Sequence, residues 1–217
     1  WASTIDHDWG FKAEAVAGRD IDYTRGKVTG GSSAVNGAVA IRGVPEDYDE
    51  WASLGNDNWS WENCLPFFRK LEDDQDESGD FHGRGGPIPV VRWNIDELRP
   101  LQVAFRDEIL DKGFPAHDDF NAPGATGISP LAQNRESRTR ISTAIGYLQP
   151  IRGRLNLTIR PHCLVHRVLI EDGRAIGLEV ESGGEVQQVY GDEVILSAGA
   201  VQSPPILLRS GIGGKED

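Results

Sequence analysis

Apolar residues at helical spacing over residues 46–72 predict two successive helices near the start of the chain. The first contains Trp51 and Leu54, which lie three positions apart. Ser60 belongs to the residue types that commonly cap a helix N-terminus, so the second helix is expected to begin beside it. The apolar stripe of this second helix recurs every three positions, at Leu65, Phe68 and Leu71.

Residues 73–86 interrupt the helical pattern with an acidic and then glycine-rich stretch. Phe81 is the one large apolar residue in it, and this composition predicts a surface connection and a candidate domain boundary. A short strand is expected over residues 87–93. The apolar positions of residues 101–112 then trace one side of a helix, which Gly113 would end.

The second half of the chain is patterned as strands. Apolar and polar residues alternate over residues 155–159, which predicts a strand. Asp172-Gly173 separates two apolar runs and predicts a tight hairpin. Gly183-Gly184 predicts a second turn, so the region is expected to form consecutive antiparallel strands.

Residues 194–196 form a short, wholly apolar run that is typical of a strand buried on both faces. We expect a helix to follow, capped by Ser203, with Pro204 at its first position and Gly211 at its end. In doubly wound α/β folds a ligand lies outside the carboxyl ends of the strands, a place that residues 197–199 would occupy. An ordinary strand-to-helix connection explains the same residues when this segment is considered alone.

The charge balance narrows the classes of protein to which the chain can belong. Its 217 residues carry a formal net charge of −12, which argues against a binder of nucleic acid or of anionic membranes. The two cysteines make no disulfide framework, and no apolar run approaches the roughly 18 residues of a membrane span. The sequence leaves the compartment open, with the cytoplasm favoured.

Both ends of the chain are expected to be internal to a longer protein. The chain begins at Trp1, contains no methionine and stops at Asp217, just beyond the expected end of a helix. A signal peptide therefore cannot be judged from this sequence.

Small residues are concentrated at residues 30–37, which read GGSSAVNG. They let backbone N–H groups approach a ligand closely, and the serine hydroxyls and the asparagine amide can bond to polar ligand atoms. A tight turn before a buried helix is an equally valid interpretation. The segment is not a phosphate-binding loop of the Walker A type, and the chain contains no G-x-G-x-x-G dinucleotide fingerprint.

Two segments resemble the signatures of a known family, in the family's order. Residues 26–36 read GKVTGGSSAVN, and residues 199–213 begin with GAVQSP and end with SGIG. Both resemble signatures of the glucose–methanol–choline (GMC) family of FAD-dependent oxidoreductases, and the resemblance covers essentially the whole chain. Thr29 departs from the first signature, in which an aliphatic residue is usual.

The resemblance implies an α/β fold, namely part of a GMC-type, Rossmann-like FAD-binding domain with an intervening α+β portion of the substrate domain. Residues 1–72 would supply an FAD-domain portion with a flavin-contacting loop and covering helices. Residues 80–150 would supply the substrate-domain portion, and residues 151–217 would return to the FAD domain. Family members are much longer, so the remaining portion of the same enzyme is expected as a partner.

The resemblance also implies which residues contact FAD. In relatives, the segments that match residues 28–32 and 36–39 lie along the pyrophosphate and the isoalloxazine. The position that matches Val165 holds the adenine through its backbone, and the turn that matches residues 197–199 lies near the adenosine. The expected cofactor-binding residues are Val28, Gly30, Gly31, Ser32, Asn36, Gly37, Ala38, Val39, Val165, Ala198 and Gly199.

No catalytic residue is expected in the chain, because none of its histidines matches the family's catalytic position. In relatives that histidine follows the counterpart of Asp217. No metal site is expected either: His162 and His166 lie four positions apart, but in a strand-like context. His82 is expected to shape a turn.

The implied function is the oxidation of a small-molecule alcohol by a dehydrogenase or oxidase, of the choline, aryl-alcohol or pyridoxine type. In relatives a histidine accepts the hydroxyl proton while hydride passes to flavin N5. Two alternatives remain open: a GMC-fold lyase or photodecarboxylase, and a non-catalytic remnant that binds other chains. The sequence leaves the alcohol and the electron acceptor undetermined. The chain alone is expected to be inactive, because it contains neither the dinucleotide fingerprint nor an identified base.

Overall fold

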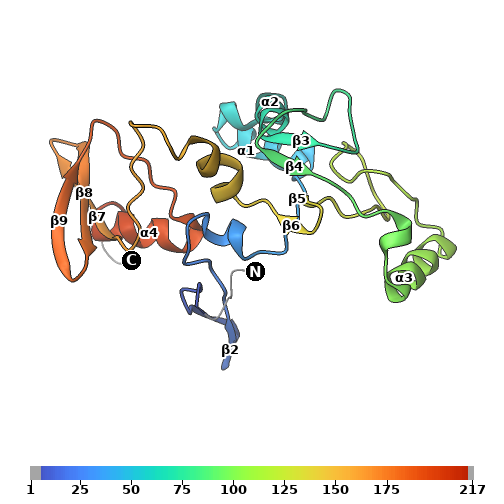
Figure 1. Cartoon of the computed structure of the whole chain (residues 1–217), viewed down its shortest axis with the longest axis horizontal. Coiled ribbons are helices and arrows are strands. Elements are labelled where there is room, and N and C mark those ends of the chain that lie inside the picture. The colour runs from blue at the N-terminus through green and yellow to red at the C-terminus, as the bar shows by residue number, and fades with distance from the viewer. Residues whose placement is uncertain (1–5, 215–217) are drawn as a thin grey trace. The chain divides into compact units, whose positions relative to one another are not determined.

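The computed structural model of the chain describes residues 6–214 (Figure 1). The chain divides into two compact units, Trp1–Leu157 and Thr158–Asp217. The first unit combines helices with short strand pairs, and the second is built from a three-stranded sheet and one α-helix. This mixed content confirms the predicted α/β class.

Three α-helices lie in the first unit: α1 (Pro45–Ser53), α2 (Trp61–Leu71) and α3 (Pro100–Asp111). Proline begins α1 and α3, where its missing N–H costs no hydrogen bond. Ser60 caps α2 as predicted, because its side chain accepts a hydrogen bond from the backbone N–H of Asn63 at 3.3 Å. The shorter helical segments are η1 (Gly31–Ala34), η2 (Asp57–Trp59), η3 (Ile95–Glu97), the π-helical η4 (Ala144–Leu148) and η5 (Gln149–Ile151).

Aromatic rings join α1 to α2. The centroid of the buried Tyr48 ring lies 5.5 Å from that of Trp51, 5.6 Å from that of Trp61 and 5.5 Å from that of Phe68. All three rings meet Tyr48 edge-on or tilted, an arrangement that the quadrupoles of aromatic rings favour. Phe68 of the predicted stripe therefore packs against α1, and Trp51 and Trp61 contribute to this packing.

The strands of the first unit form separate pairs. The pairs are β1 (Lys12–Val16) antiparallel to β2 (Arg19–Asp22), β3 (Glu72–Asp74) parallel to β4 (Ile88–Val90), and β5 (Arg135–Glu136) antiparallel to β6 (Thr139–Arg140). The strand predicted within residues 87–93 is confirmed as β4, and β3 continues directly from the end of α2 (Figure 1).

Most of residues 73–86 are exposed or half-buried, as predicted for a surface connection, but Asp74, His82 and Gly83 are buried. Asp74 is 0% exposed, and His82 is also buried. The backbone is closely packed as well, since a Cβ atom on Gly83 would lie 1.7 Å from the carbonyl oxygen of Arg69. The segment therefore folds back onto the end of α2, and the side chains of Asp74 and His82 are buried because they pair with each other and with charged residues of other segments.

The division between the two compact units falls between Leu157 and Thr158. Residues 73–86, which were predicted as a candidate domain boundary, therefore lie inside the first unit. A compact unit can combine segments from two domains of a longer protein. The assignment of residues 1–72, 80–150 and 151–217 to an FAD domain and a substrate domain thus stays a prediction.

The second unit confirms the predicted consecutive hairpins. β7 (Leu164–Glu171), β8 (Arg174–Ser182) and β9 (Glu185–Tyr190) form an antiparallel sheet in that order (Figure 1). Asp172 and Gly173 have φ angles of 49° and 77°, and Gly183 and Gly184 have φ angles of 63° and 83°. Two consecutive residues with positive φ are what the tightest hairpin turns require.

Helix α4 (Gly199–Arg209) packs against β7. The prediction that Ser203 caps this helix and Pro204 begins it was wrong, because the helix begins five residues earlier, at Gly199, and the Ser203 hydroxyl accepts a hydrogen bond from the Ala198 N–H at 3.2 Å. The predicted end at Gly211 is confirmed. With φ at 81°, Gly211 donates its N–H to the Leu208 carbonyl, and Ile212 donates to the Leu207 carbonyl, both at 3.0 Å. This pair of hydrogen bonds is the Schellman motif.

Two predicted strands are absent from the structure. Residues 155–159 form no strand, and Leu155 is fully exposed. Residues 194–196 form no strand either, and Ile195 is 75% exposed while its two neighbours are half-buried. A wholly apolar run is buried on both faces only when strands pair with it on both sides. Among residues 6–214, no strand pairs with it.

The chain leaves an unusually large area in contact with solvent. It exposes 15,318 Å², whereas a compact monomer of its mass exposes roughly 9,800 Å². Helix α3 illustrates the excess: the helix and its terminating Gly113 are as predicted, but Leu101 is 81% and Phe105 is 62% exposed. None of the helices formed by residues 6–214 has both the length and the apolar character needed to cross a membrane.

Candidate cofactor-binding site

Glycines let residues 26–39, the small-residue loop, fold onto themselves and onto the segment near residue 144. A Cβ atom on Gly26 would lie 2.4 Å from the Gly31 carbonyl oxygen. Gly30 has φ at 94°, and a Cβ atom there would lie 3.1 Å from Cβ of Ala144. These two glycines are therefore required by the packing of the chain itself.

Hydroxyl groups close the first turn of the small-residue loop. The Ser33 hydroxyl donates to the Gly30 carbonyl at 2.6 Å and accepts from the Thr143 N–H at 3.0 Å. The Ser32 hydroxyl accepts from the Gly26 N–H at 3.1 Å, so its own proton can still be donated to a ligand. Ser32 is exposed and fits the predicted contact, whereas Ser33 is occupied within the chain.

The second half of the loop is an Asx-type turn. The side-chain oxygen of Asn36 accepts from the Ala38 N–H at 2.9 Å, and Ala38 has φ at 58° and is 7% exposed. Val39 faces Gln133 in an isolated antiparallel bridge, whose hydrogen bonds are made by the residues on either side of Val39. The N–H and C=O of Val39 therefore point away from that partner segment, where a ligand can reach them.

Gly37 differs from the other glycines of the loop. It is exposed, and a Cβ atom there would come no closer than 3.8 Å, to Cγ2 of Val39. Among residues 6–214, no acceptor is found for its N–H. Nothing in the chain's own packing requires a glycine at this position. The absence of a side chain instead suits a bound group that approaches the backbone closely, as an FAD ring would.

The remaining predicted residues lie in the second unit. Val165 is half-buried on β7, the edge strand of the sheet, opposite Val180. Ala198 and Gly199 form the start of α4, where both are exposed and a Cβ atom on Gly199 would meet nothing within 4 Å. Each unit thus carries its own part of the predicted site.

A family model described as GMC oxidoreductase matches residues 10–217. The chain belongs to the GMC oxidoreductase family. Residues 26–36 and 199–213, which carried the resemblance, both lie within the matched range.

Relatives and solved structures agree with this assignment. The chain is 42% identical over 211 residues to an oxygen-dependent choline dehydrogenase of Photobacterium profundum. The alignment covers 95% of the chain and 37% of that dehydrogenase. The crystal structure of pyridoxine 4-oxidase from Mesorbium loti superposes with a TM-score of 0.91 at 34% identity, covering 97% of the chain and 42% of the oxidase.

A second solved structure, an FAD-dependent oxidoreductase from Chaetomium thermophilum, superposes with a TM-score of 0.90 at 29% identity. The match covers 99% of the GMC chain and 40% of that protein. The chain therefore spans about two fifths of the length of the relatives it matches.

A buried group of charged residues in the GMC chain was not predicted. The charged cluster comprises three carboxylates, two guanidinium groups and one imidazole, all in side chains that are at most 7% exposed. They come from segments far apart in the sequence and are Arg42, Glu72, Asp74, His82, Arg92 and Asp119.

Each carboxylate of the charged cluster lies against one of the two arginines. Arg42 lies 2.5 Å from Glu72. Arg92 donates from Nη1 to both oxygens of Asp74, at 2.9 and 3.1 Å, and from Nη2 to Asp119. Hydrogen bonds between ionised groups are shorter and stronger than those between neutral groups.

His82 lies between two carboxylates of the cluster. Its Nδ1 lies 3.1 Å from Oδ2 of Asp74, and its Nε2 lies 3.1 Å from Oδ2 of Asp119. The imidazole therefore lies between two carboxylates, with Nε2 at hydrogen-bond distance from Asp119. Glu72, Asp74 and His82 also have the spacing of metal ligands, but the guanidinium groups already occupy their carboxylates and would repel a cation.

The pairing shifts the acidity of the buried groups. Burial by itself raises the pKa of Asp74, but hydrogen bonds from the Arg92 guanidinium and from the N–H groups of Glu77 and Asp76 outweigh it and hold the pKa below its usual value. Burial lowers the pKa of Arg92, but its bonds to Asp74 and Asp119 outweigh that effect and raise it.

We expect the free energy of unfolding of the chain to decrease as the pH falls below about 4, the usual pKa of an aspartate. The pKa of Asp74 is lowered in the folded state, so the unfolded chain binds the proton first and acid favours unfolding. Urea unfolding at pH 5 and pH 3, followed by tryptophan fluorescence, measures the effect. An equal dependence on pH in the Asp74→Asn variant would show that Asp74 does not cause it.

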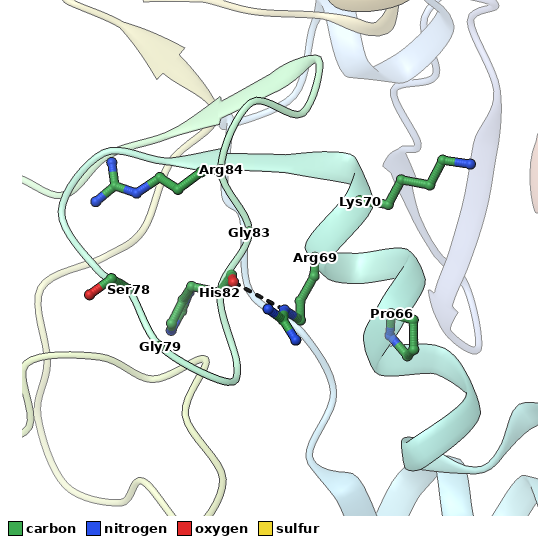
Figure 2. Close-up of a pocket in the computed structure, with 8 residues that line it drawn as sticks. All are labelled: Pro66, Arg69, Lys70, Ser78, Gly79, His82, Gly83 and Arg84. Atoms are coloured by element: carbon green, nitrogen blue, oxygen red, sulfur yellow. Dashed lines mark hydrogen bonds between the residues drawn. The ribbon is translucent and has the colours of Figure 1, made fainter.

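A hollow of about 530 Å³ lies beside the cluster, at the end of α2. Figure 2 shows Arg69, Lys70 and Arg84 at its wall, with Nε of Arg69 donating to the His82 carbonyl at 3.2 Å. Lys70 and Arg84 extend in opposite directions (Figure 2), so the three cations do not converge on one anion. The hollow is not part of the predicted cofactor site.

The sequence did not predict the residues that hydrogen-bond to the small-residue loop from other segments of the chain. They are Gln133, Asn134, Arg140 and Thr143. Each lies about a hundred positions from its partner, and none has a local pattern that predicts such a contact. One signal was available for the charged cluster: Glu72 and Asp74 are two positions apart on a strand, so both point to the same side.

Proposed function

We propose that this chain is part of an FAD-dependent enzyme that oxidises a small-molecule alcohol. The observation that carries the proposal is Gly37, an exposed glycine with room for a side chain at the centre of the small-residue loop. The relatives support the substrate class, since one is described as a choline dehydrogenase and another as a pyridoxine 4-oxidase. The FAD-dependent oxidoreductase among the solved structures supports the cofactor.

The backbone of the small-residue loop would hold the flavin side of FAD, through Gly37 and Val39 in particular. Val165 and the start of α4 at Ala198 and Gly199 would hold the adenosine side. FAD, when bound, accepts a hydride from the carbon that carries the hydroxyl group. The part of this chain in the reaction is to bind and orient, and the half-exposed side chain of Val39 adds an apolar surface that excludes water.

The hydroxyl proton would be removed by a residue outside this chain. None of its histidines is both exposed at the small-residue loop and available as a base: His82, for example, is held between carboxylates in the charged cluster. We therefore propose the remaining portion of the same enzyme as a partner of the chain. The large exposed area, including the apolar side of α3, supports such a partner.

Anaerobic reduction of the flavin tests the proposal. The complete protein that contains this chain is purified, its absorption spectrum is recorded, and primary alcohols such as choline and pyridoxine are added without oxygen. We expect a flavin spectrum that bleaches with at least one alcohol. A flavin spectrum that no alcohol bleaches would favour a lyase or photodecarboxylase, and a protein without flavin would favour a non-catalytic binding role.

A further inference from the structure

Arg140 makes a two-pronged contact with the small-residue loop. It lies on β6 and is half-buried. Its Nη1 donates to the Ala34 carbonyl at 2.6 Å, and its Nη2 donates to the Asn36 carbonyl. The two acceptors lie two positions apart in the loop, and more than a hundred residues separate them from Arg140 in the sequence.

The planar guanidinium group suits this task because its donors form a rigid fork. Ala34 is the last residue of η1, where backbone carbonyls lack partners within the helix. A charged donor satisfies such a carbonyl better than a neutral one. One side chain therefore fixes both the end of η1 and the residue before Gly37.

Fixing the Asn36 carbonyl also fixes the direction of the next N–H group. The Asn36–Gly37 peptide is trans, so its C=O and N–H point in opposite directions from one plane. Because the carbonyl of Asn36 is turned toward Arg140, the N–H of Gly37 is turned away from it.

The neighbouring N–H groups are already used within the chain. The Asn36 N–H donates to the Ser32 carbonyl at 2.9 Å, and the Ala38 N–H donates to the side chain of Asn36 at 2.9 Å. Gln133 donates to the Gly37 carbonyl at 3.2 Å and so fixes the following peptide as well. Of these three successive donors, the Gly37 N–H is the one without an acceptor among residues 6–214.

We infer that Arg140 is a positioning residue, which holds the Ala34 and Asn36 carbonyls and thereby directs the Gly37 N–H toward the bound cofactor. The inference rests on the proposed function, since it is FAD that would accept this hydrogen bond. Arg140 does not itself contact the cofactor in this account. Arg140 orients the Gly37 N–H by fixing the plane of the Asn36–Gly37 peptide.

Arg140→Ala, Arg140→Lys and the control Arg138→Ala test the inference. Arg138 lies two positions away, is exposed, and makes no side-chain hydrogen bond among the described residues. Amide hydrogen exchange of residues 34–38 in the cofactor-free protein reports the loop directly, and exchange in α1 and α2 checks that the fold is kept. The dissociation constant for FAD is measured on the same proteins.

We expect Arg140→Ala to speed exchange of residues 34–38 about tenfold and to weaken FAD binding about tenfold, as the loss of charged hydrogen bonds implies. Arg140→Lys should resemble Arg140→Ala more than the parent, because lysine keeps the charge but loses the fork. Arg138→Ala should match the parent in both measurements. Full recovery in Arg140→Lys would overturn the positioning role in favour of a charge effect.

Three other results would also overturn the inference. Unchanged exchange of residues 34–38 in Arg140→Ala would show that Arg140 does not hold the loop. Faster exchange with unchanged FAD binding would show that the loop is held but is not directed at the cofactor, while the proposed enzyme class stands. A parent protein that binds no FAD would remove the proposed function, and this inference with it.

Discussion

Replacing Asp74 with asparagine is expected to lower the free energy of unfolding of the chain by about 3–5 kcal/mol. Asp74 is 0% exposed and accepts two hydrogen bonds from Nη1 of Arg92, while His82 lies against its other side. Asparagine keeps the shape but removes the negative charge, so the buried Arg92 guanidinium loses one of its carboxylate partners and keeps Asp119 and the more distant Asp76. Urea unfolding followed by tryptophan fluorescence gives the free energy of each variant.

Asp80→Asn is the matched control for this experiment, because Asp80 is an exposed aspartate of the same segment. It should change the free energy by less than about 0.5 kcal/mol. Adding Arg92→Met to Asp74→Asn should restore part of the loss, since the double variant removes one charge of each sign. A double variant less stable than Asp74→Asn, or an Asp74→Asn variant as stable as the control, would contradict this account of the cluster.

The second large effect is expected for Gly37→Val, which should raise the dissociation constant of the complete enzyme for FAD at least about a hundredfold. A branched side chain at this position would stand between the Gly37 backbone and the bound ring, and about 3 kcal/mol corresponds to that change in affinity. The fold itself should tolerate the substitution, because the nearest atom to a Cβ there is 3.8 Å away. The flavin content after purification and the dissociation constant measure the effect.

Gly153→Val serves as the control, because a Cβ atom at Gly153 would meet nothing within 4 Å and the residue lies outside the predicted site. It should leave both the flavin content and the unfolding midpoint unchanged. Flavin content in Gly37→Val equal to that of the control would count against contact between the small-residue loop and the flavin.

Local features of the fold could be predicted because a few neighbouring residues determine them. Asp172-Gly173 and Gly183-Gly184 adopt the positive φ angles of tight hairpins, and Ser60 caps α2. In each of these cases the hydrogen bonds or backbone angles involve residues at most a few positions apart. The family signatures added the expected position of the cofactor loop, which no local pattern could have distinguished from an ordinary turn.

Long-range contacts explain the failures. The run at residues 194–196 was predicted as a buried strand, but burial on both faces depends on partner strands that its own sequence does not contain. Asp74 and His82 lie in an acidic, glycine-rich segment that normally faces solvent, and they are buried because Arg92 and Asp119 reach them from elsewhere in the sequence. Charge pairing over such distances in sequence leaves no local pattern.

The assembly of the charged cluster has a consequence for how the first unit opens. Its members are spread between Arg42 and Asp119, so no stretch of chain can form the cluster alone. Any partial arrangement leaves a buried charge unpaired, which costs more than either the complete cluster or the solvated side chains. We therefore expect the cluster to open as a whole, so that the buried side chains of Asp74 and His82 reach solvent together.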